Sequence, residues 1–312
     1  MDVERLRLLR ELADRGTVAA TAQAMSLTPS AVSQQLKTLQ REAGVELLEP
    51  AGRRVRLTEA GRVLVARADD VLGALDRARA DMDAYRTTPR GAVRVALFPS
   101  GAAMLLAGLI TRAADRGVDV EGRDIDRPAS DAPVLLADCD VVVVHRDERD
   151  TSSWGPRFDA RVLLREPLDV VLPTGHHLAE QAAITLDQLS DEPWIGVQGG
   201  LMVDDVLRSL ALITGVQPRI VQRVNDFRVV EELVRAGVGV ALLPRYVLTA
   251  RELVRRPLSG LRIARRIEAI TRTGAQARPA IAVVLDILES MAQEVAAETV
   301  CRNSEYESDS VS

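Results

Sequence analysis

The stretch from residue 28 to residue 39 constrains the fold most, because its pattern predicts a helix with two unlike faces. Thr28 can accept hydrogen bonds from the free amides of the first turn, and Pro29 fits the first helical position. The polar face carries Ser30, Ser33, Gln34, Lys37 and Arg41, and the apolar face carries Val32, Leu36, Leu39 and Ala43. Such a polar face suits a DNA major groove, where amides contact base edges and cations bind phosphates. The alternative is the solvated face of an ordinary amphipathic helix.

The segments before this helix favour the DNA-binding interpretation. Residues 2–15 predict a helix that ends at Gly16, and Thr17 can cap a second, alanine-rich helix over residues 18–25. Two helices, a short link and a third helix with a polar face form a helix-turn-helix arrangement, whose last helix enters the major groove.

A basic hairpin is predicted directly after the third helix. Gly44 ends that helix, and residues 45–48 and 55–57 have the pattern of two short strands. Arg53 and Arg54 lie at the tip between them, from which they can reach a phosphate backbone or a minor groove. A solvated turn is the alternative, but a hairpin beside such a helix favours a wing.

Residues 58–86 predict one long helix with a narrow apolar stripe. The stripe runs in steps of four and three and consists of Leu64, Ala68, Val71, Leu75, Ala78, Met82 and Tyr85. This spacing is typical of a coiled-coil seam, although a helix in the core of its own chain can have it too. A long helix between domains has little of its own chain to pack on, which favours dimerisation. Residues 87–91 contain Pro and Gly and predict a hinge.

Composition limits the classes of protein that remain. A chain of 312 residues with 47% apolar and 27% charged residues predicts a soluble globular protein of two or three domains. The net charge is −5, and the first 60 residues carry nine Lys and Arg against eight Asp and Glu. DNA binding must therefore depend on the local placement of charge. Cys139 and Cys301 form no disulfide framework, and His145, His176 and His177 give no zinc pattern, so no metal or cofactor is expected.

The sequence shows no targeting segment. No apolar run reaches the length of a membrane span, and the N-terminus lacks the pattern of a signal peptide. We therefore expect a cytoplasmic protein without a membrane partner.

From residue 92 the pattern changes to alternating strands and helices, which predicts an α/β region. Strands are expected at residues 93–97, 118–125, 140–144, 194–197, 219–224 and 238–243, and one or two more within 261–273. Residues 161–173 are expected to be extended, with an interruption at Pro167. Helices are expected at residues 102–114, 132–137, 201–214, 227–236 and 279–298. The acidic, serine-rich tail 301–312 is expected to be disordered.

Taken together, these motifs resemble the LysR-type transcriptional regulators. The N-terminal resemblance consists of GTVAATA at residues 16–22, LTPSAVSQQL at 27–36, GVELLE at 44–49 and RVRLTEAG at 54–61. A further signature, AGVGVALLP at residues 236–244, is similar to a strand of the family's effector domain. The N-terminal segments together are specific for this family, whereas each segment alone is weak support for the resemblance. The resemblance covers nearly the whole chain and ends before the tail.

Two departures from the family pattern concern DNA contacts. Many members carry an arginine where this chain has Gln34, and glutamine pairs with adenine edges whereas arginine prefers guanine. Many members also carry Phe and Arg where Leu48 and Pro50 stand, which removes one phosphate contact that Arg53 and Arg54 can replace.

The resemblance implies a division into three parts and a tail. Residues 1–58 would form the winged helix-turn-helix domain, residues 59–90 the dimerisation helix and hinge, and residues 91–300 an effector-binding domain. That domain would have the type II periplasmic-binding-protein fold, with two Rossmann-like subdomains at residues 92–163 plus 265–300 and at residues 164–264. Two crossover strands, near residues 161–167 and 261–266, would join them.

A small molecule would bind in the cleft between the subdomains. Strand ends and helix N-termini line such clefts, and their free amides hold anions. The candidate residues are Ser100, Gly101, His145, Gly199, Gly200, Leu201, Met202, Asp226 and Phe227. Each also has a purely structural interpretation: a helix cap for Ser100, a turn for the glycines, a core position for Phe227 and a loop contact for His145. The ligand expected is a small organic anion or an amino acid.

An enzyme is disfavoured, and no catalytic residue is assigned. Gly237 and Gly239 precede their strand, whereas a nucleotide-binding glycine loop follows one, and no phosphate-binding or nucleophile-elbow motif occurs. We expect a transcriptional regulator whose operator binding or promoter activation responds to the effector. It would act as a homodimer or homotetramer and contact RNA polymerase. The alternatives are a ligand-binding module whose N-terminal helices serve assembly only, and a DNA-binding regulator without an effector.

Overall fold

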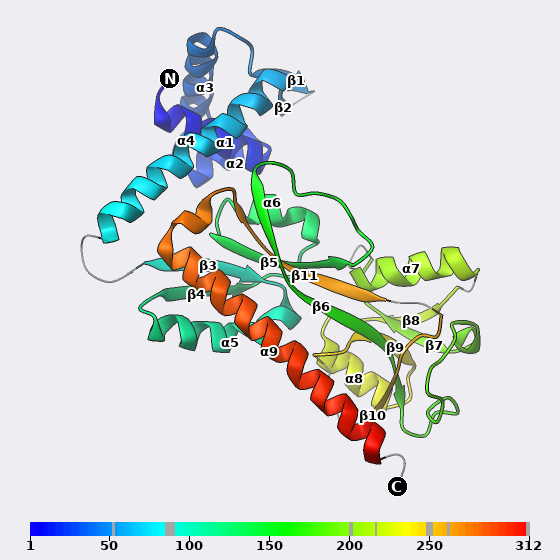
Figure 1. The fold of residues 1–312 in the computed structure, drawn as a ribbon. Helices are drawn as coiled ribbons and strands as arrows, with labels where there is room; N and C mark the ends of the chain where they lie inside the picture. Colours follow the sequence, from blue (N-terminus) through cyan, green and yellow to red (C-terminus); the bar gives the residue numbers. More distant parts are fainter. Residues whose placement is uncertain are drawn as a thin grey trace.

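The computed structural model describes residues 1–51, 54–84, 91–199, 202–215, 217–247, 252–260 and 263–309. A helical N-terminal domain lies above an α/β body, and one long helix leads from the first to the second (Figure 1). Arg53, Tyr85, Gly200 and Leu201 lie outside the described residues. The side chains of Arg54 and Met202 are not described either.

The N-terminal domain has the three helices and the hairpin that the sequence predicts. Its elements are α1 (Val3–Arg15), α2 (Val18–Ala24), α3 (Pro29–Ala43), β1 (Leu48–Ala51) and β2 (Arg54–Leu57). Thr28 caps α3 by accepting a hydrogen bond from the Ala31 amide at 3.2 Å, and Gly44 ends α3 with a φ of 71°. The apolar face of α3 packs inward, since Val32 and Leu39 are fully buried. The burial of this face leaves the polar face outward.

The first strand of the hairpin begins later than predicted. It starts at Leu48 instead of Val45, and Val45 is exposed. The side-chain oxygen of Gln40 on α3 accepts hydrogen bonds from the amides of Leu47 and Leu48, at 3.1 and 2.9 Å. These bonds turn the chain so that Leu47 enters the core before the strand starts.

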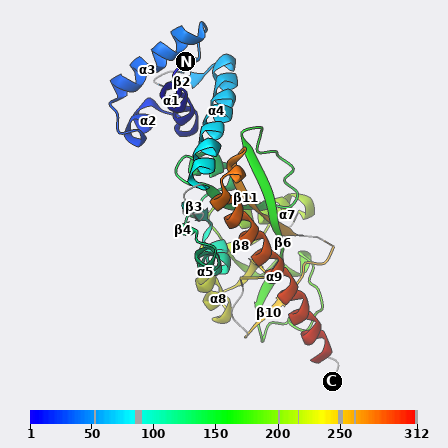
Figure 2. The ribbon, with the colours of Figure 1, turned by 60° about the vertical axis from the view of Figure 1, so that its left-hand side comes forward.

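Helix α4 (Glu59–Ala84) runs from the N-terminal domain to the α/β body (Figure 2). Thr58 accepts a hydrogen bond from the Gly61 amide at 3.0 Å, as expected for its N-cap. The predicted apolar stripe is divided between two surroundings. Ala68 is fully buried in the core of its own N-terminal domain, so it does not belong to an exposed seam. Val71 and Met82 are exposed further along the helix.

The α/β body alternates strands and helices in the order expected. Its elements are β3 (Ala92–Leu97), α5 (Pro99–Asp115), β4 (Asp119–Asp124), α6 (Ala132–Leu135), β5 (Val141–Asp147), β6 (Phe158–Pro173), β7 (Pro193–Gly196), α7 (Met202–Thr214), β8 (Arg219–Arg223), α8 (Phe227–Arg235), β9 (Val240–Pro244), β10 (Leu253–Arg256), β11 (Ala264–Arg272) and α9 (Pro279–Asp309). The strands follow the order β4-β3-β5-β11-β6-β9-β7-β8, and β10 pairs with β6. The sequence analysis missed β10.

Strand β6 joins the two halves of the body. It pairs with β11 along residues 158–167 and then with β9 and β10 along residues 168–173. The expected interruption at Pro167 is wrong, because Pro167 lies where β6 changes partners. There its carbonyl accepts a hydrogen bond from the Arg245 amide at 2.9 Å, and its missing N–H breaks no pairing.

Each half has its own core. In the first half, Leu105 and Leu109 of α5 pack with Val284 and Leu288 of α9 against the sheet. In the second half the core surrounds the fully buried Trp194. Helix α9 continues to Asp309, so the backbone is helical over most of the tail that composition predicts to be disordered. Among the described residues, the helices are too short or too polar to span a membrane.

Candidate nucleic-acid interface and ligand cleft

Helix α3 presents the predicted polar face at the surface. Ser30, Gln34, Lys37 and Arg41 are exposed on it, and Ser33 is half-buried. The Ser33 hydroxyl donates to the Pro29 carbonyl at 2.9 Å, so only its lone pairs remain for a ligand. Arg41 donates to the Thr38 hydroxyl at 2.9 Å, which directs its guanidinium along the helix. The structure therefore brings the predicted α3 residues together on one accessible surface.

Two further glutamines of α3 have structural contacts. Gln35 accepts a hydrogen bond from Arg5 of α1 at 2.8 Å, and Arg5 also pairs with Glu42. Gln40 holds the start of the hairpin through the Leu47 and Leu48 amides. Sequence spacing alone does not distinguish these two glutamines from Gln34, which is exposed.

The hairpin lies beside α3 in the position of a wing (Figure 1). Its strands pair Leu48 with Leu57 and Glu49 with Arg56, and the side chains of Glu49 and Arg56 form an ion pair at 2.6 Å. A surface hollow at the C-terminal half of α3 and the segment after it is lined by Gln34, Lys37, Gln40, Arg41, Gly44, Val45 and Glu46. This concave surface next to the polar face has the form of a groove-binding site.

A cavity of about 570 Å³ lies between the two halves of the α/β body. Its lining from the first half includes Phe98, Ser100 and His145, and its lining from the second half includes Phe227 and Val203. Three predicted ligand residues, Ser100, His145 and Phe227, thus meet at one cavity. Its mixed apolar and polar lining is typical of small-molecule sites.

Ser100 lies in the first turn of α5, where its hydroxyl contacts the buried guanidinium of Arg265. Arg265 of β11 donates to the Ser100 hydroxyl at 3.1 Å, and its guanidinium lies 5.0 Å from the Phe98 ring centre. Arg265 is also paired with the fully buried Glu166 at 2.7 Å. Phe98 occupies the cap position of α5, and a phenyl ring cannot accept hydrogen bonds from the first amides as Ser or Asp would. The first turn of α5 is therefore suited to an anion.

His145 at the end of β5 packs edge-on against Phe98, with ring centres 4.4 Å apart. Burial holds the pKa of His145 well below its usual value, and the nearby Arg265 lowers it further. Its Nδ1 is buried and has no hydrogen-bond partner in the described part of the chain. A neutral imidazole with an unused nitrogen can accept or donate one hydrogen bond to a ligand.

The other predicted cleft residues have different outcomes. Gly101 does not line the cavity: a Cβ there would lie 2.7 Å from Cζ of Phe98, so glycine allows the ring to pack on α5. Gly199 is exposed and absent from the lining. Gly200, Leu201 and the Met202 side chain are not described. Asp226 lines the cavity and caps α8 by accepting from the Arg228 amide at 2.9 Å.

The sequence analysis missed several residues of the cleft. Asn225 donates to Asp126 at 3.1 Å, and this bond joins the two halves across the cavity. Tyr246 and Arg265 also line the cavity. Burial raises the pKa of Tyr246, with a further contribution from Glu166. No local pattern marks these residues, because their contacts join segments far apart in sequence.

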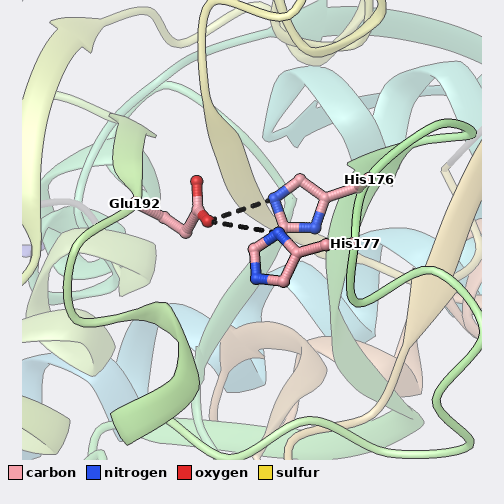
Figure 3. A group of neighbouring side chains, drawn as sticks. All are labelled: His176, His177 and Glu192. Atoms are coloured by element: carbon pink, nitrogen blue, oxygen red, sulfur yellow. Dashed lines mark ion pairs between the residues drawn. The ribbon is translucent and has the colours of Figure 1, made fainter.

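His176, His177 and Glu192 gather in the second half of the body (Figure 3). His176 Nε2 lies 3.4 Å and His177 Nδ1 lies 3.8 Å from Glu192 Oε1. However, the Leu178 amide donates to His176 Nδ1 at 3.2 Å, which places the proton of the neutral ring on Nε2. A metal would need Nε2 to be free of that proton. The arrangement fits a turn fixed by hydrogen bonds better than a metal site.

Family models match both parts of the chain. Residues 3–62 match the bacterial regulatory helix-turn-helix protein model of the lysR family, and residues 86–293 match the LysR substrate binding domain. The first match covers the helices and the wing described above, and the second covers most of the α/β body with its cleft.

Individual relatives are similar over most of their length. The chain is 28% identical over 254 residues to the transcriptional dual regulator GltC of Bacillus subtilis, which covers 78% of this chain and 81% of that protein. It is 24% identical over 289 residues to the RuBisCO operon transcriptional regulator of Allochromatium vinosum, covering 90% and 93%.

Solved structures show the same fold at lower identity. A full-length OxyR variant from Pseudomonas aeruginosa has a TM-score of 0.64 and 19% identity, covering 92% of this chain and 94% of that one. An OxyR variant from Corynebacterium glutamicum has a TM-score of 0.58 and 23% identity, covering 97% and 95%.

Proposed function

Because the chain belongs to the LysR family of DNA-binding transcriptional regulators, which carry an effector-binding domain, we propose specific roles for its two sites. Helix α3 binds the major groove of an operator, and a small molecule in the 570 Å³ cleft changes operator binding or promoter activation. Members of this family are regulators, not enzymes. The observation that carries the proposal is the polar face of α3, exposed beside the wing while its apolar face is buried.

The side chains of α3 have distinct proposed tasks. The Gln34 amide can pair with an adenine edge, and Lys37 and Arg41 can bind phosphates. The Ser33 oxygen can accept a hydrogen bond from a base amino group, because its own proton is used on Pro29. Further phosphate contacts are assigned to Thr28 and Ser30 at the N-terminus of α3 and to Arg53 and Arg54 of the wing. Pro29 has no N–H to donate and is assigned an apolar contact with the DNA.

The cleft favours a small organic anion or an amino acid. A carboxylate at the first turn of α5 would meet Ser100 and the helix amides, with Arg265 behind the hydroxyl. The His145 nitrogen offers a further hydrogen bond, and Phe227 and Val203 offer apolar contact. Gly200, Leu201 and Met202 stay candidates for the same site.

The exposed part of α4 supports a homodimer, which can pair into a tetramer. Val71, Ala78 and Met82 are exposed along one helix, and Leu75 is half-buried between them. A second copy of α4 would cover this apolar surface and place two α3 helices on two operator half-sites. A change in the cleft would then alter DNA bending and promoter contacts, including those to RNA polymerase. Such regulation requires access to the chromosome, so we propose a cytoplasmic location.

Two measurements on the full chain test the proposal. Fluorescence anisotropy with a duplex from the region upstream of its own gene should show binding that weakens as salt rises. No binding at low salt would leave the ligand-binding module as the better interpretation. Isothermal titration with carboxylates and amino acids should give heat that S100A reduces. No heat, and no change in operator affinity, would leave a regulator without an effector.

A further inference from the structure

A second cavity lies at the junction between the N-terminal domain and the α/β body, and we call it the junction cavity. Its volume is about 400 Å³, and it is separate from the ligand cleft. Arg7 and Arg10 of α1 and Asp69 of α4 line it from one side. The body contributes Arg94, Asp140, Arg272 and Arg278. Five of these charged side chains are therefore arginines and two are aspartates.

The carboxylates around the junction cavity are shared between arginines. Asp140 pairs with Arg94 at 3.3 Å and with Arg278 at 2.8 Å. Asp69 pairs with Arg157 and, at 3.6 Å, with Arg272. Because five arginines in the lining face two aspartates, each shared between two guanidiniums, positive charge is in excess there. One oxygen of Asp69, Oδ1, is itself buried without a hydrogen bond.

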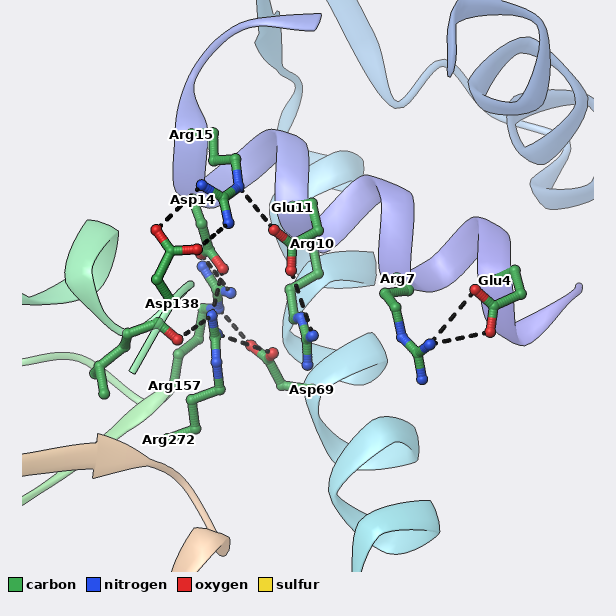
Figure 4. Close-up of polar contacts among 11 residues, drawn as sticks. Glu4, Arg7, Arg10, Glu11, Asp14, Arg15, Asp69, Asp138, Arg157 and Arg272 are labelled. Carbon is green, nitrogen blue, oxygen red and sulfur yellow. Dashed lines mark hydrogen bonds and ion pairs between the residues drawn. The ribbon is translucent and has the colours of Figure 1, made fainter. Parts of the chain in front are cut away.

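Further pairs show the same sharing (Figure 4). Asp14 pairs with Arg157 at 3.0 Å and with Arg272 at 2.5 Å. Glu11 pairs with Arg10 at 3.5 Å and with Arg15 at 2.9 Å. Asp14 and Glu11, which do not line the cavity, are therefore each paired with two guanidiniums as well.

Two guanidinium nitrogens show this excess directly. Arg10 Nε and Arg272 Nη1 are buried and make no hydrogen bond within the described part of the chain. Arg272 Nη1 has only an ion-pair contact, at 3.6 Å, with Asp69 Oδ1. Burial lowers the pKa of Arg10, and the proximity of Arg272 lowers it further. Buried donors without acceptors and neighbouring like charges cost stability, which a bound counter-ion would recover.

We propose that the junction cavity binds a small dianionic oxyanion of the phosphate-monoester or dicarboxylate class. Guanidinium forks match both groups geometrically, and two negative charges suit the facing Arg10 and Arg272. Since Arg10 belongs to α1 and Arg272 to β11, the ligand would join the DNA-binding domain to the effector domain. Occupancy of this site would thereby set how firmly the two domains hold together, whichever molecule fills the ligand cleft.

Isothermal titration of the full chain tests this proposal with inorganic phosphate and, separately, malonate, each against chloride at matched ionic strength. We expect saturable heat with at least one anion, and the stronger response identifies the class. R10M should weaken binding tenfold or more. R112M is the matched control, because Arg112 pairs with Glu294 on the body surface and lies outside the cavity lining. Heat no larger than with chloride, or equal binding by R10M and R112M, overturns the proposal.

A second variant, which adds a negative charge, tests the proposal independently of whether R10M folds. Ala137 lines the junction cavity and is half-buried, so A137E would place a tethered carboxylate among the arginines. We expect a higher melting temperature than wild type and loss of phosphate and malonate binding. A lower melting temperature with unchanged anion binding contradicts the proposal. Operator binding by the wild type in chloride is a separate readout, so failure of the DNA-binding role would be recognised independently.

Discussion

Asp14 at the end of α1 and Arg272 at the end of β11 form a partly buried ion pair at 2.5 Å, although 258 residues separate them in sequence. The Asp14 side chain has no exposed surface, and its second oxygen pairs with Arg157 at 3.0 Å. One carboxylate of the DNA-binding domain therefore holds two guanidiniums of the effector domain. Breaking a buried pair leaves an uncompensated charge, which usually costs more than the pair itself contributes.

We expect Asp14→Asn to lower the free energy of unfolding by about 3 kcal/mol, because the half-buried guanidiniums of Arg157 and Arg272 then share only Asp69. Asp138→Asn is the control: Asp138 pairs with Arg15 across the same junction, but its side chain is 57% exposed. An exposed pair contributes only about 0–1 kcal/mol. Chemical denaturation of both variants measures the difference, and equal losses would show that Asp14 does not hold the domains together.

Gln34→Arg should change which operator sequences are bound without abolishing binding. Glutamine pairs bidentately with adenine and arginine with guanine, and each such pair contributes roughly 1–3 kcal/mol of discrimination. Selection from a randomised half-site library should show one position shifting from adenine to guanine. If both proteins select identical sequences, Gln34 does not take part in base recognition.

Lys37→Gln should weaken binding to all sequences and reduce its dependence on salt. Each phosphate contact contributes about 0.9 to the slope of log affinity against log salt on duplex DNA, so losing one contact should make that slope shallower by about this amount. Anisotropy titrations at several salt concentrations measure the slope. Lys37→Arg keeps the charge and should keep the slope. If Lys37→Gln retains the wild-type slope, Lys37 makes no phosphate contact.

The sequence predicts the fold well where hydrophobic spacing is unambiguous. The valine run in residues 141–144 could only be a buried strand, and the capped, two-faced pattern of α3 could only be a surface helix. The stripe on α4 was ambiguous, since the same spacing serves a dimer seam and an intramolecular core. Ala68 belongs to the core because α1 packs on that turn of α4, which spacing along one helix does not reveal.

The candidate sites were predictable only in part, for a related reason. Ser100 and Phe227 are found by their places at helix starts, which is a local signal. Arg265 meets Ser100 across 165 residues, and Asn225 meets Asp126 across 99. The junction cavity forms only where α1 and β11 lie close together. No sequence motif predicts that contact. Long-range polar pairs have no sequence period, so they emerge only from the folded chain.

His145 gives the protein a pH dependence whose sign follows from its burial. Its pKa in the folded state lies well below the ordinary value of 6.5, chiefly because burial disfavours the charged ring. Below pH 6.5 the unfolded chain therefore binds a proton that the folded chain does not. Stability must fall as pH decreases from about 6.5, by at most about 1.4 kcal/mol per pH unit for this one group.

His145→Gln removes this linkage but retains a polar side chain at the cleft. Urea unfolding between pH 7.5 and 5 should therefore give a wild-type stability that falls more steeply than that of the variant. Both proteins carry His176 and His177, so the comparison isolates the contribution of residue 145. Parallel stability curves would mean that His145 takes up a proton as readily in the folded chain as in the unfolded one.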